Sequence, residues 1–166
     1  MKKKVSKALL MGLILLGVLS FKQPFQSSGT TKVKCMIQLT NYSGEGAYIV
    51  VSVLDSTGNY LNTLQVLGDD YEWYPDLTAW WSYFQPLKKS GIDAISGATI
   101  SGGERSIFIL EIEESLIDSN HTLRFETAVE DQKYYESDLE IPLTSENTRG
   151  SFNGTGYIRY VRIIPN

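Results

Sequence analysis

The sequence has one cysteine, Cys35, and one histidine, His121, among 166 residues. A single cysteine excludes an intrachain disulfide, and we expect no disulfide-linked partner, so an apolar core must hold the fold. Cys35 shares its parity with Val33 and Ile37 in an alternating segment, which predicts a buried strand residue. A single histidine excludes a metal cage built from several histidines, and no metal ligands are predicted. We expect His121 to be an ordinary turn residue.

Long apolar runs are also lacking. The run from Ala8 to Phe21 is shorter than the roughly 20 residues that span a bilayer, and four lysines precede it. This pattern predicts a signal peptide over residues 1–20 and an exported protein, periplasmic or on the cell surface. An uncleaved N-terminal anchor is the alternative. Residues 21–32, rich in Ser, Thr and Gln, predict a flexible tether, and residues 33–166 predict one domain.

Positive charge is scarce in the predicted mature chain. The formal net charge of the whole sequence is −4, and removal of the four lysines before Ser20 would make it −8. An acidic domain argues against nucleic acid and anionic membranes as partners. The carboxylate pairs Asp69-Asp70 and Glu113-Glu114 are interpreted as surface charge, because adjacent strand residues point to opposite faces.

Period-2 alternation dominates what remains. Short turns such as Asp55–Asn59 and Asn153–Gly156 separate the alternating segments. In one segment Leu123 and Phe125 face the core, whereas Glu126 belongs to the polar parity. The pattern predicts a mostly β fold, an immunoglobulin-like antiparallel β-sandwich of about seven strands. The expected strands are 33–39, 48–54, 60–66, 106–113, 123–129, 133–141 and 157–164.

One segment departs from the β pattern and predicts an inserted short helix over about 74–84. Leu77, Trp80 or Trp81, and Phe84 recur at helical spacing, and Pro75 suits the first turn. An aromatic stripe of this kind usually packs against a sheet. Trp80 and Trp81 are neighbours, however, and cannot both face inward.

A second unusual segment runs from Asp93 to Ser101, with the sequence Asp-Ala-Ile-Ser-Gly-Ala-Thr-Ile-Ser. Its core, Ser96-Gly97-Ala98-Thr99, is expected by chance in about one chain of this size in three hundred. Gly97 and Ala98 are small, so a large enzyme could approach the Thr99 hydroxyl. The alternative interpretation is a simple turn in a long polar loop.

This segment resembles the acceptor motif of bacterial FMN transferases, which take FMN from FAD and join its phosphate to the final threonine. The Tyr48–Asp55 hairpin, the Asp76–Trp81 helix and the motif occur in an order that resembles the bacterial periplasmic family called domain of unknown function 2271. The resemblance covers nearly the whole mature chain. The family more often has a proline and a glycine after the threonine, where this chain has Ile100 and Ser101.

The resemblance implies an exported electron-transfer protein that is a carrier and not an enzyme, without catalytic residues. FMN would be bound covalently at Thr99, with Asp93, Ser96, Gly97 and Ala98 forming the site that an FMN transferase recognises. We expect Thr99 to be exposed and outside regular strands. One of Tyr74, Trp81 or Tyr83 would stack on the flavin ring, and a membrane redox protein would exchange electrons with it. The rival hypothesis is a non-enzymatic immunoglobulin-like binding module for a protein or glycan.

Overall fold

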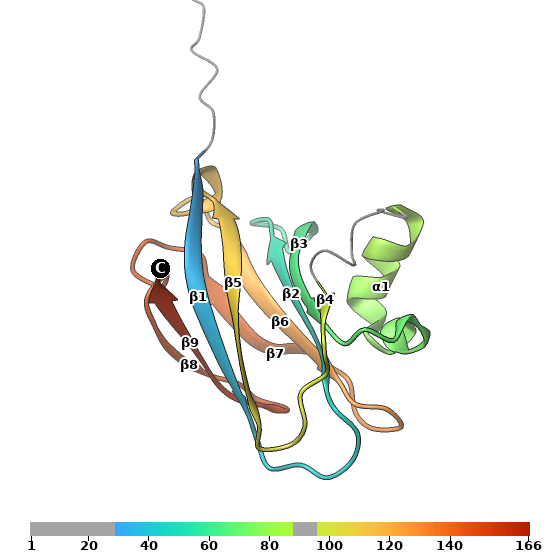
Figure 1. Cartoon of the computed structure of the whole chain (residues 1–166). Helices are drawn as coiled ribbons and strands as arrows, with labels where there is room; N and C mark the ends of the chain where they lie inside the picture. The colour runs from blue at the N-terminus through green and yellow to red at the C-terminus, as the bar shows by residue number, and fades with distance from the viewer. Residues whose placement is uncertain (1–28, 88–95) are drawn as a thin grey trace, which may run out of the picture.

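The computed structural model describes residues 29–87 and 96–166, and their strands form two facing sheets (Figure 1). The four-stranded sheet has the order β5-β1-β9-β8, and the five-stranded sheet has the order β4-β3-β2-β6-β7. The strands are β1 Thr30–Leu39, β2 Tyr48–Leu54, β3 Tyr60–Leu67, β4 Ser96–Gly97, β5 Arg105–Glu113, β6 Thr122–Ala128, β7 Tyr135–Pro142, β8 Gly150–Asn153 and β9 Ile158–Pro165.

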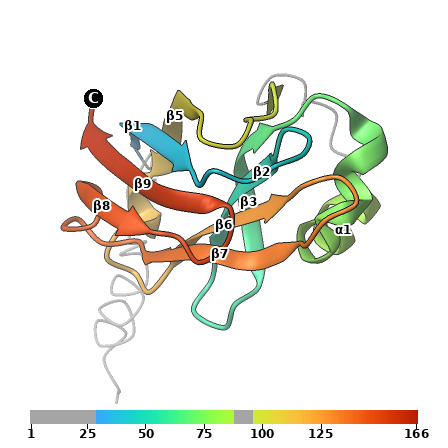
Figure 2. The same ribbon diagram turned by 90° about the horizontal axis from the view of Figure 1, so that it is seen from below.

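The predicted mostly β sandwich is confirmed, and the view from below separates its two layers (Figure 2). All seven expected strands are present within a few residues of their predicted limits. The two additional strands are short, with two residues in β4 and four in β8. Pairing is antiparallel except between β3 and β4, which run parallel.

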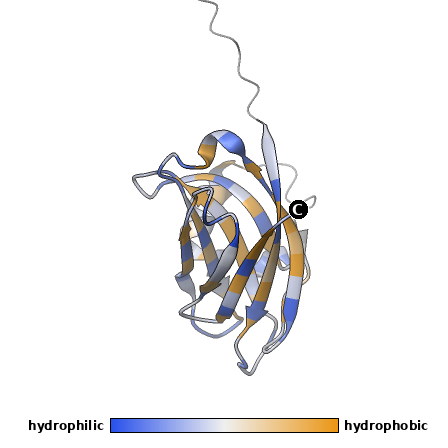
Figure 3. Cartoon of the chain, turned by 90° about the vertical axis from the view of Figure 1, so that its left-hand side faces the viewer, coloured by the Kyte–Doolittle hydropathy of each residue, from blue (hydrophilic) through white to orange (hydrophobic). Residues whose placement is uncertain are grey.

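Alternation along the strands places one side chain in two between the sheets, and the ribbon accordingly alternates between apolar and polar residues (Figure 3). In β1 the inward residues include Cys35 and Ile37, both fully buried. Every residue of β2 is buried, because β2 lies in the middle of the sheet and both of its faces are covered. In β5, Phe108 has the same parity as the fully buried Leu110 but is only half-buried, since β5 is an edge strand.

The inserted helix is confirmed as α1 Thr78–Phe84, flanked by the 3₁₀ helices Tyr71–Asp76 and Gln85–Leu87. It begins later than predicted, and Pro75 lies in the preceding 3₁₀ helix rather than in its first turn. The Asp70 carboxylate accepts a hydrogen bond from the Glu72 backbone N–H and caps this 3₁₀ segment. In the described ranges, no helix has the length and apolar character needed to cross a membrane.

The helical segment covers the outer face of the five-stranded sheet and creates a second, smaller core there (Figure 1). Leu77, Trp80 and Phe84 pack on the outward side chains of Val50 and Val66. The sheet is therefore buried on both faces over part of its area. This covering decides the environment of every outward residue beneath it.

A buried carboxylate links the strands at one end of the sandwich. Asp138 of β7 is fully buried and accepts a hydrogen bond from the Thr127 hydroxyl of β6 at 2.7 Å. It also accepts from the backbone N–H groups of Thr155, Gly156 and Ile158, in the turn before and the start of β9. One side chain thereby joins the two sheets, and its charge is offset by four donors.

Candidate functional site

The Ser96–Thr99 segment leaves the edge of the five-stranded sheet beside the end of β3. Ser96 and Gly97 form β4, parallel to Val66 and Leu67. The Gly97 carbonyl accepts a hydrogen bond from the Gly68 backbone N–H at 2.5 Å. Asp93, predicted to be part of the recognition site, lies outside the described residues, and Ser96 is described only through its backbone.

Thr99 lies outside regular strands, as expected, but its side chain is half-buried rather than exposed. The reason is its neighbour Ile100, which is buried and forms an antiparallel bridge with Ala47. This bridge brings Thr99 against Gly46, where an added Cβ would meet the Thr99 hydroxyl oxygen at 2.3 Å. Within the described part of the chain, no hydrogen bond engages that hydroxyl. Ala98 is exposed, so one side of the motif is open to solvent.

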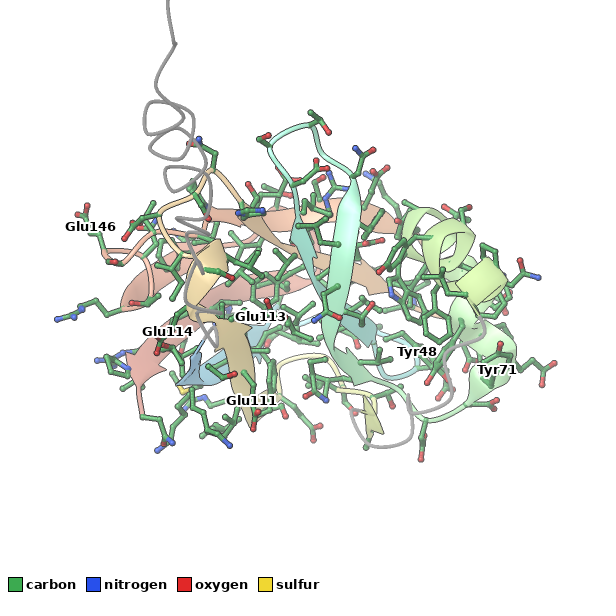
Figure 4. The ribbon with its side chains drawn as sticks, turned by 90° about the horizontal axis from the view of Figure 1, so that it is seen from above. Tyr48, Tyr71, Glu111, Glu113, Glu114 and Glu146 are labelled. Carbon is green, nitrogen blue, oxygen red and sulfur yellow. The ribbon has the colours of Figure 1, made fainter. Side chains whose placement is uncertain are left out.

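The aromatic residues of the helical segment divide between core and surface. Trp80 is fully buried, whereas Trp81 is half-buried, so the prediction that only one of them faces inward is confirmed. Trp81 packs edge-on against Tyr71 with ring centroids 5.3 Å apart. Tyr71 is 56% exposed and is the aromatic residue that the sequence analysis did not single out. Figure 4 shows Tyr71 beside α1, with Tyr48 nearby.

The three aromatic residues considered for stacking differ in how far their rings are engaged. Tyr74 is buried, and its hydroxyl donates a hydrogen bond to the Gly68 carbonyl at 2.9 Å. Tyr83 is engaged elsewhere, since its ring stacks on Tyr60 with centroids 5.1 Å apart. Trp81 and Tyr71 are left as a partly open aromatic pair.

Gly68 connects the motif to this aromatic pair. Its N–H bonds to Gly97 of the motif, and its carbonyl accepts from Tyr74, whose ring lies 5.1 Å from that of Tyr71. Gly68 has φ +123°, and a Cβ there would overlap the Tyr48 ring at 2.1 Å. Glycine is therefore required at this position by both backbone conformation and close approach. Two consecutive hydrogen bonds therefore connect Gly97 to the packed rings of Tyr48, Tyr71, Tyr74 and Trp81, which we call the aromatic layer.

The surroundings of this region are acidic. Burial raises the pKa of Tyr48 to about 12, and the carboxylates of Asp70, Glu130 and Asp69 contribute to the rise. The pKa of Glu130 is itself raised, by desolvation and then by repulsion from Glu45 and other acidic neighbours. Negative charge thus accumulates around the aromatic layer.

Glu126 was predicted to be one of the outward polar residues of its strand. It does face outward from β6, but it is fully buried because α1 covers it. Its carboxylate accepts hydrogen bonds from the hydroxyls of Tyr60 at 2.6 Å and Tyr134 at 2.5 Å. It also accepts from the backbone N–H of Trp80 at 3.3 Å. Burial raises the pKa of Glu126 to about 7, although these hydrogen bonds oppose the shift.

Glu126 therefore attaches the helix to the sheet rather than serving as surface charge. Trp80 lies in the first turn of α1, where backbone N–H groups have no partner within the helix. Tyr134 extends the attachment, because the Ala79 N–H donates to its hydroxyl at 3.2 Å. The signal that could have revealed this role is the predicted helix itself, which needs a surface to cover.

His121 lies at a turn, as expected, but it has a serine partner. The Ser119 hydroxyl oxygen lies 3.0 Å from Nδ1 of His121. The same hydroxyl is 2.8 Å from the Ser115 carbonyl, which can only accept its proton. The imidazole therefore donates to Ser119, an arrangement that does not activate a nucleophile. Among the described residues, no group of three or more His, Cys, Asp and Glu side chains could hold a metal ion.

Comparison with known families gives one assignment. Residues 30–160 match the family DUF2271, described as a predicted periplasmic protein, which agrees with the predicted export of the chain. Neither the curated proteins nor the solved structures contain a match. Because the family match covers both sheets and the inserted helix, the chain belongs to the family DUF2271.

Proposed function

We propose that this protein is an exported electron carrier that bears FMN covalently on Thr99. The observation that carries the proposal is the state of the Thr99 hydroxyl, which has no hydrogen-bond partner among the described residues. It lies in a non-strand segment behind the exposed Ala98. The small side chains of Gly97 and Ala98 leave room for the active site of a transferase.

The attachment would be a group transfer from FAD by a flavin transferase. The Thr99 oxygen forms a phosphoester bond with the FMN phosphate, the pyrophosphate bond of FAD breaks, and AMP leaves. The hydroxyl proton passes to a base of the transferase. The flavin supplies reversible electron transfer, and the domain supplies position and environment.

Trp81 and Tyr71 are the residues best placed to order the flavin ring. Tyr71 is 56% exposed and packs on Trp81. The pair is connected to the motif by the ring contact with Tyr74 and by the hydrogen bonds from Tyr74 to Gly68 and from Gly68 to Gly97. Aromatic faces stack favourably on planar rings, by about 0.5–1.5 kcal/mol beyond simple burial.

The acidic surroundings support a covalent rather than a reversible attachment. FMN is an anion, and the carboxylates of Asp69, Asp70 and Glu130 act on the aromatic layer at Tyr48. These charges would weaken noncovalent binding of a phosphate, so a phosphoester bond would be needed to retain it. The same charges would oppose reduction to an anionic flavin and lower its reduction potential.

Intact mass spectrometry tests the proposal. The full chain is co-expressed with an active FMN transferase, and its mass should increase by one FMN less one water. Thr99→Ala should abolish the increase without changing the melting temperature, because a half-buried hydroxyl without hydrogen bonds contributes little to stability. Thr57→Ala, at an exposed threonine in the β2–β3 turn, is the matched control and should be labelled like the wild type.

Two further variants separate attachment from ring ordering. Asp93→Ala should reduce labelling, since that carboxylate occupies the acidic position of the motif. Tyr71→Ala should be labelled normally but should lose order at the flavin, seen as lower fluorescence anisotropy. A wild-type chain that stays colourless and unmodified beside an active transferase would overturn the proposal and favour the binding module.

A further inference from the structure

The outer face of the four-stranded sheet carries exposed apolar residues among cations. Strand register places Met36 of β1 between Ile107 of β5 and Arg162 of β9. In the next outward row, Lys34 lies between Ile109 and Ile164. Cross-strand neighbours of this kind have Cβ atoms about 4.5–5.5 Å apart, so the six side chains form one continuous surface. We call this surface the outer sheet face.

Its apolar part is unusually open. Ile107 is 59% exposed and Ile109 is 39% exposed, and both lie on β5, an edge strand. Exposed β-branched residues on an edge strand invite unwanted pairing, which natural sheets generally avoid. Clustered exposure of this kind is typical of a surface that a partner covers.

A groove adjoins these residues over β1, β9 and β8. It is an open hollow of about 600 Å³ lined by Met36, Tyr160 and two arginines, Arg149 and Arg162. In the described part of the chain, neither guanidinium has an ion pair or a hydrogen bond. Arg124, by contrast, forms ion pairs with both Glu136 and Glu140. The two groove arginines are therefore available to an external anion.

The groove and the outer sheet face are positively charged, whereas the chain as a whole is negatively charged. The sequence has a formal net charge of −4, and acidic residues surround the aromatic layer near Tyr48. Lys34, Arg149 and Arg162 instead make the groove and the outer sheet face cationic. Figure 4 places Glu111 and Glu113 on β5, away from Tyr48 and Tyr71, and Glu111 is paired with Lys32 at 2.6 Å.

We propose that the outer sheet face docks a partner protein whose contact surface is apolar at its centre and carries carboxylates. Ile107, Ile109 and Met36 would make the apolar contact, and Arg149 and Arg162 would pair with the carboxylates. Arginine, tyrosine and methionine are the residues enriched in protein interfaces. A small ligand would fill the groove but leave the two β5 isoleucines uncovered.

The test uses the full chain and a fluorescent peptide of alternating glutamate and leucine as a surrogate for the acidic partner surface. Fluorescence anisotropy should show binding that weakens as salt is added. The double variant Arg149→Glu, Arg162→Glu should bind about tenfold more weakly or worse. Ile107→Asp should also weaken binding. Lys133→Glu, a charge reversal in the β6–β7 turn, should bind like the wild type.

Controls decide among other occupants. The substituted side chains of Ile107, Lys133, Arg149 and Arg162 are all exposed, so melting temperatures should stay close to the wild-type value. Met36, which is half-buried, is left intact. Equal binding by the double variant overturns the proposal, as does equal binding of a lysine–leucine peptide. Binding to phosphatidylglycerol vesicles but not to the peptide would assign the face to a lipid surface. Self-association in sedimentation that the double variant abolishes would assign it to a second copy.

Discussion

Glu126 is the residue through which the inserted helix is attached to the sheet. Its carboxylate is buried and is satisfied by Tyr60, Tyr134 and the backbone of Trp80. Deprotonation places a charge in this site, and burial opposes it more than the three hydrogen bonds favour it. The pKa consequently rises from its ordinary value of 4.5 to about 7.

This shift predicts a pH dependence of stability with a defined sign. Between about pH 4.5 and 7 the folded protein binds a proton at Glu126 that the unfolded chain has lost. The contribution of Glu126 to the free energy of unfolding therefore falls as pH rises through this window, by about 3 kcal/mol, and levels off above it. Glu126→Gln cannot titrate and should remove this component.

Denaturant titrations at several pH values check the prediction. The difference between wild type and Glu126→Gln isolates the single group, because all other carboxylates are common to both proteins. Glu126→Ala serves as the comparison and should be destabilised at every pH. It leaves two tyrosine hydroxyls and a backbone N–H without their acceptor, each at about 1–3 kcal/mol. A pH profile identical in wild type and Glu126→Gln would contradict the assignment.

Asp138 holds the two sheets together at one end. Asp138→Ala would remove the acceptor of the Thr127 hydroxyl and of the Gly156 and Ile158 N–H groups, whereas the Thr155 N–H keeps the backbone carbonyl of residue 138 as an acceptor. We expect a loss of at least about 3 kcal/mol in the free energy of unfolding, because each of these three donors left without an acceptor costs about 1–3 kcal/mol. Ser137→Ala, at the adjacent exposed residue, should change stability by less than about 0.5 kcal/mol. Equal midpoints for the two variants would show that the network is dispensable.

At the scale of elements, position in the sheet decides how much a phenylalanine contributes. Phe125 of β6 is fully buried, whereas Phe108 of β5 is half-buried on an edge strand. Phe125→Ala should lower the free energy of unfolding by about 3–5 kcal/mol, through lost burial and a cavity. Phe108→Ala should cost clearly less, because water already reaches part of that side chain. Chemical denaturation measures both, and the reverse order would mean that the strand faces are misassigned.

The helical segment shows where element prediction succeeds and where it stops. The spacing of Leu77, Trp80 or Trp81, and Phe84 predicted α1 and its buried stripe, and the structure shows that Trp80 is the inward member of the pair. The start at Thr78 could not be predicted, because Tyr74 is tied to the Gly68 carbonyl and Asp70 caps a preceding 3₁₀ helix. Long-range contacts decide where α1 begins, whereas the periodicity of the sequence predicts only which face of the helix is buried.

For the whole molecule, the absence of a disulfide makes the single thiol a reporter of global unfolding. Cys35 lies in β1, between β5 and β9, and is fully buried. Burial raises its pKa to about 12, so both access and thiolate formation are suppressed in the folded state. We expect no reaction with a thiol reagent at pH 8 without denaturant and rapid reaction in concentrated guanidinium. Rapid labelling of the native protein would contradict the prediction, because it would show that Cys35 becomes accessible by local opening of the core.

The sequence by itself determined the architecture, because alternation, turn residues and helical spacing are local properties. They set the strands, the inserted helix, and the burial of residues such as Cys35 and Phe125. The motif around Thr99 was likewise visible as residues, although FMN on it remains a proposal. Which element covers each face of a strand, however, is not a local property of the sequence.

Only the tertiary structure decided the environments of residues that alternation leaves on the polar side. Glu126 is buried because α1 folds over it, and Thr99 is half-buried because Ile100 pairs with Ala47. The sheet order placed Ile107, Met36 and Arg162 in one row, although they are far apart in the chain. The burial of a side chain and the charges around it depend on which elements pack together. Contacts between residues distant in the sequence decide that packing, and local periodicity does not encode them.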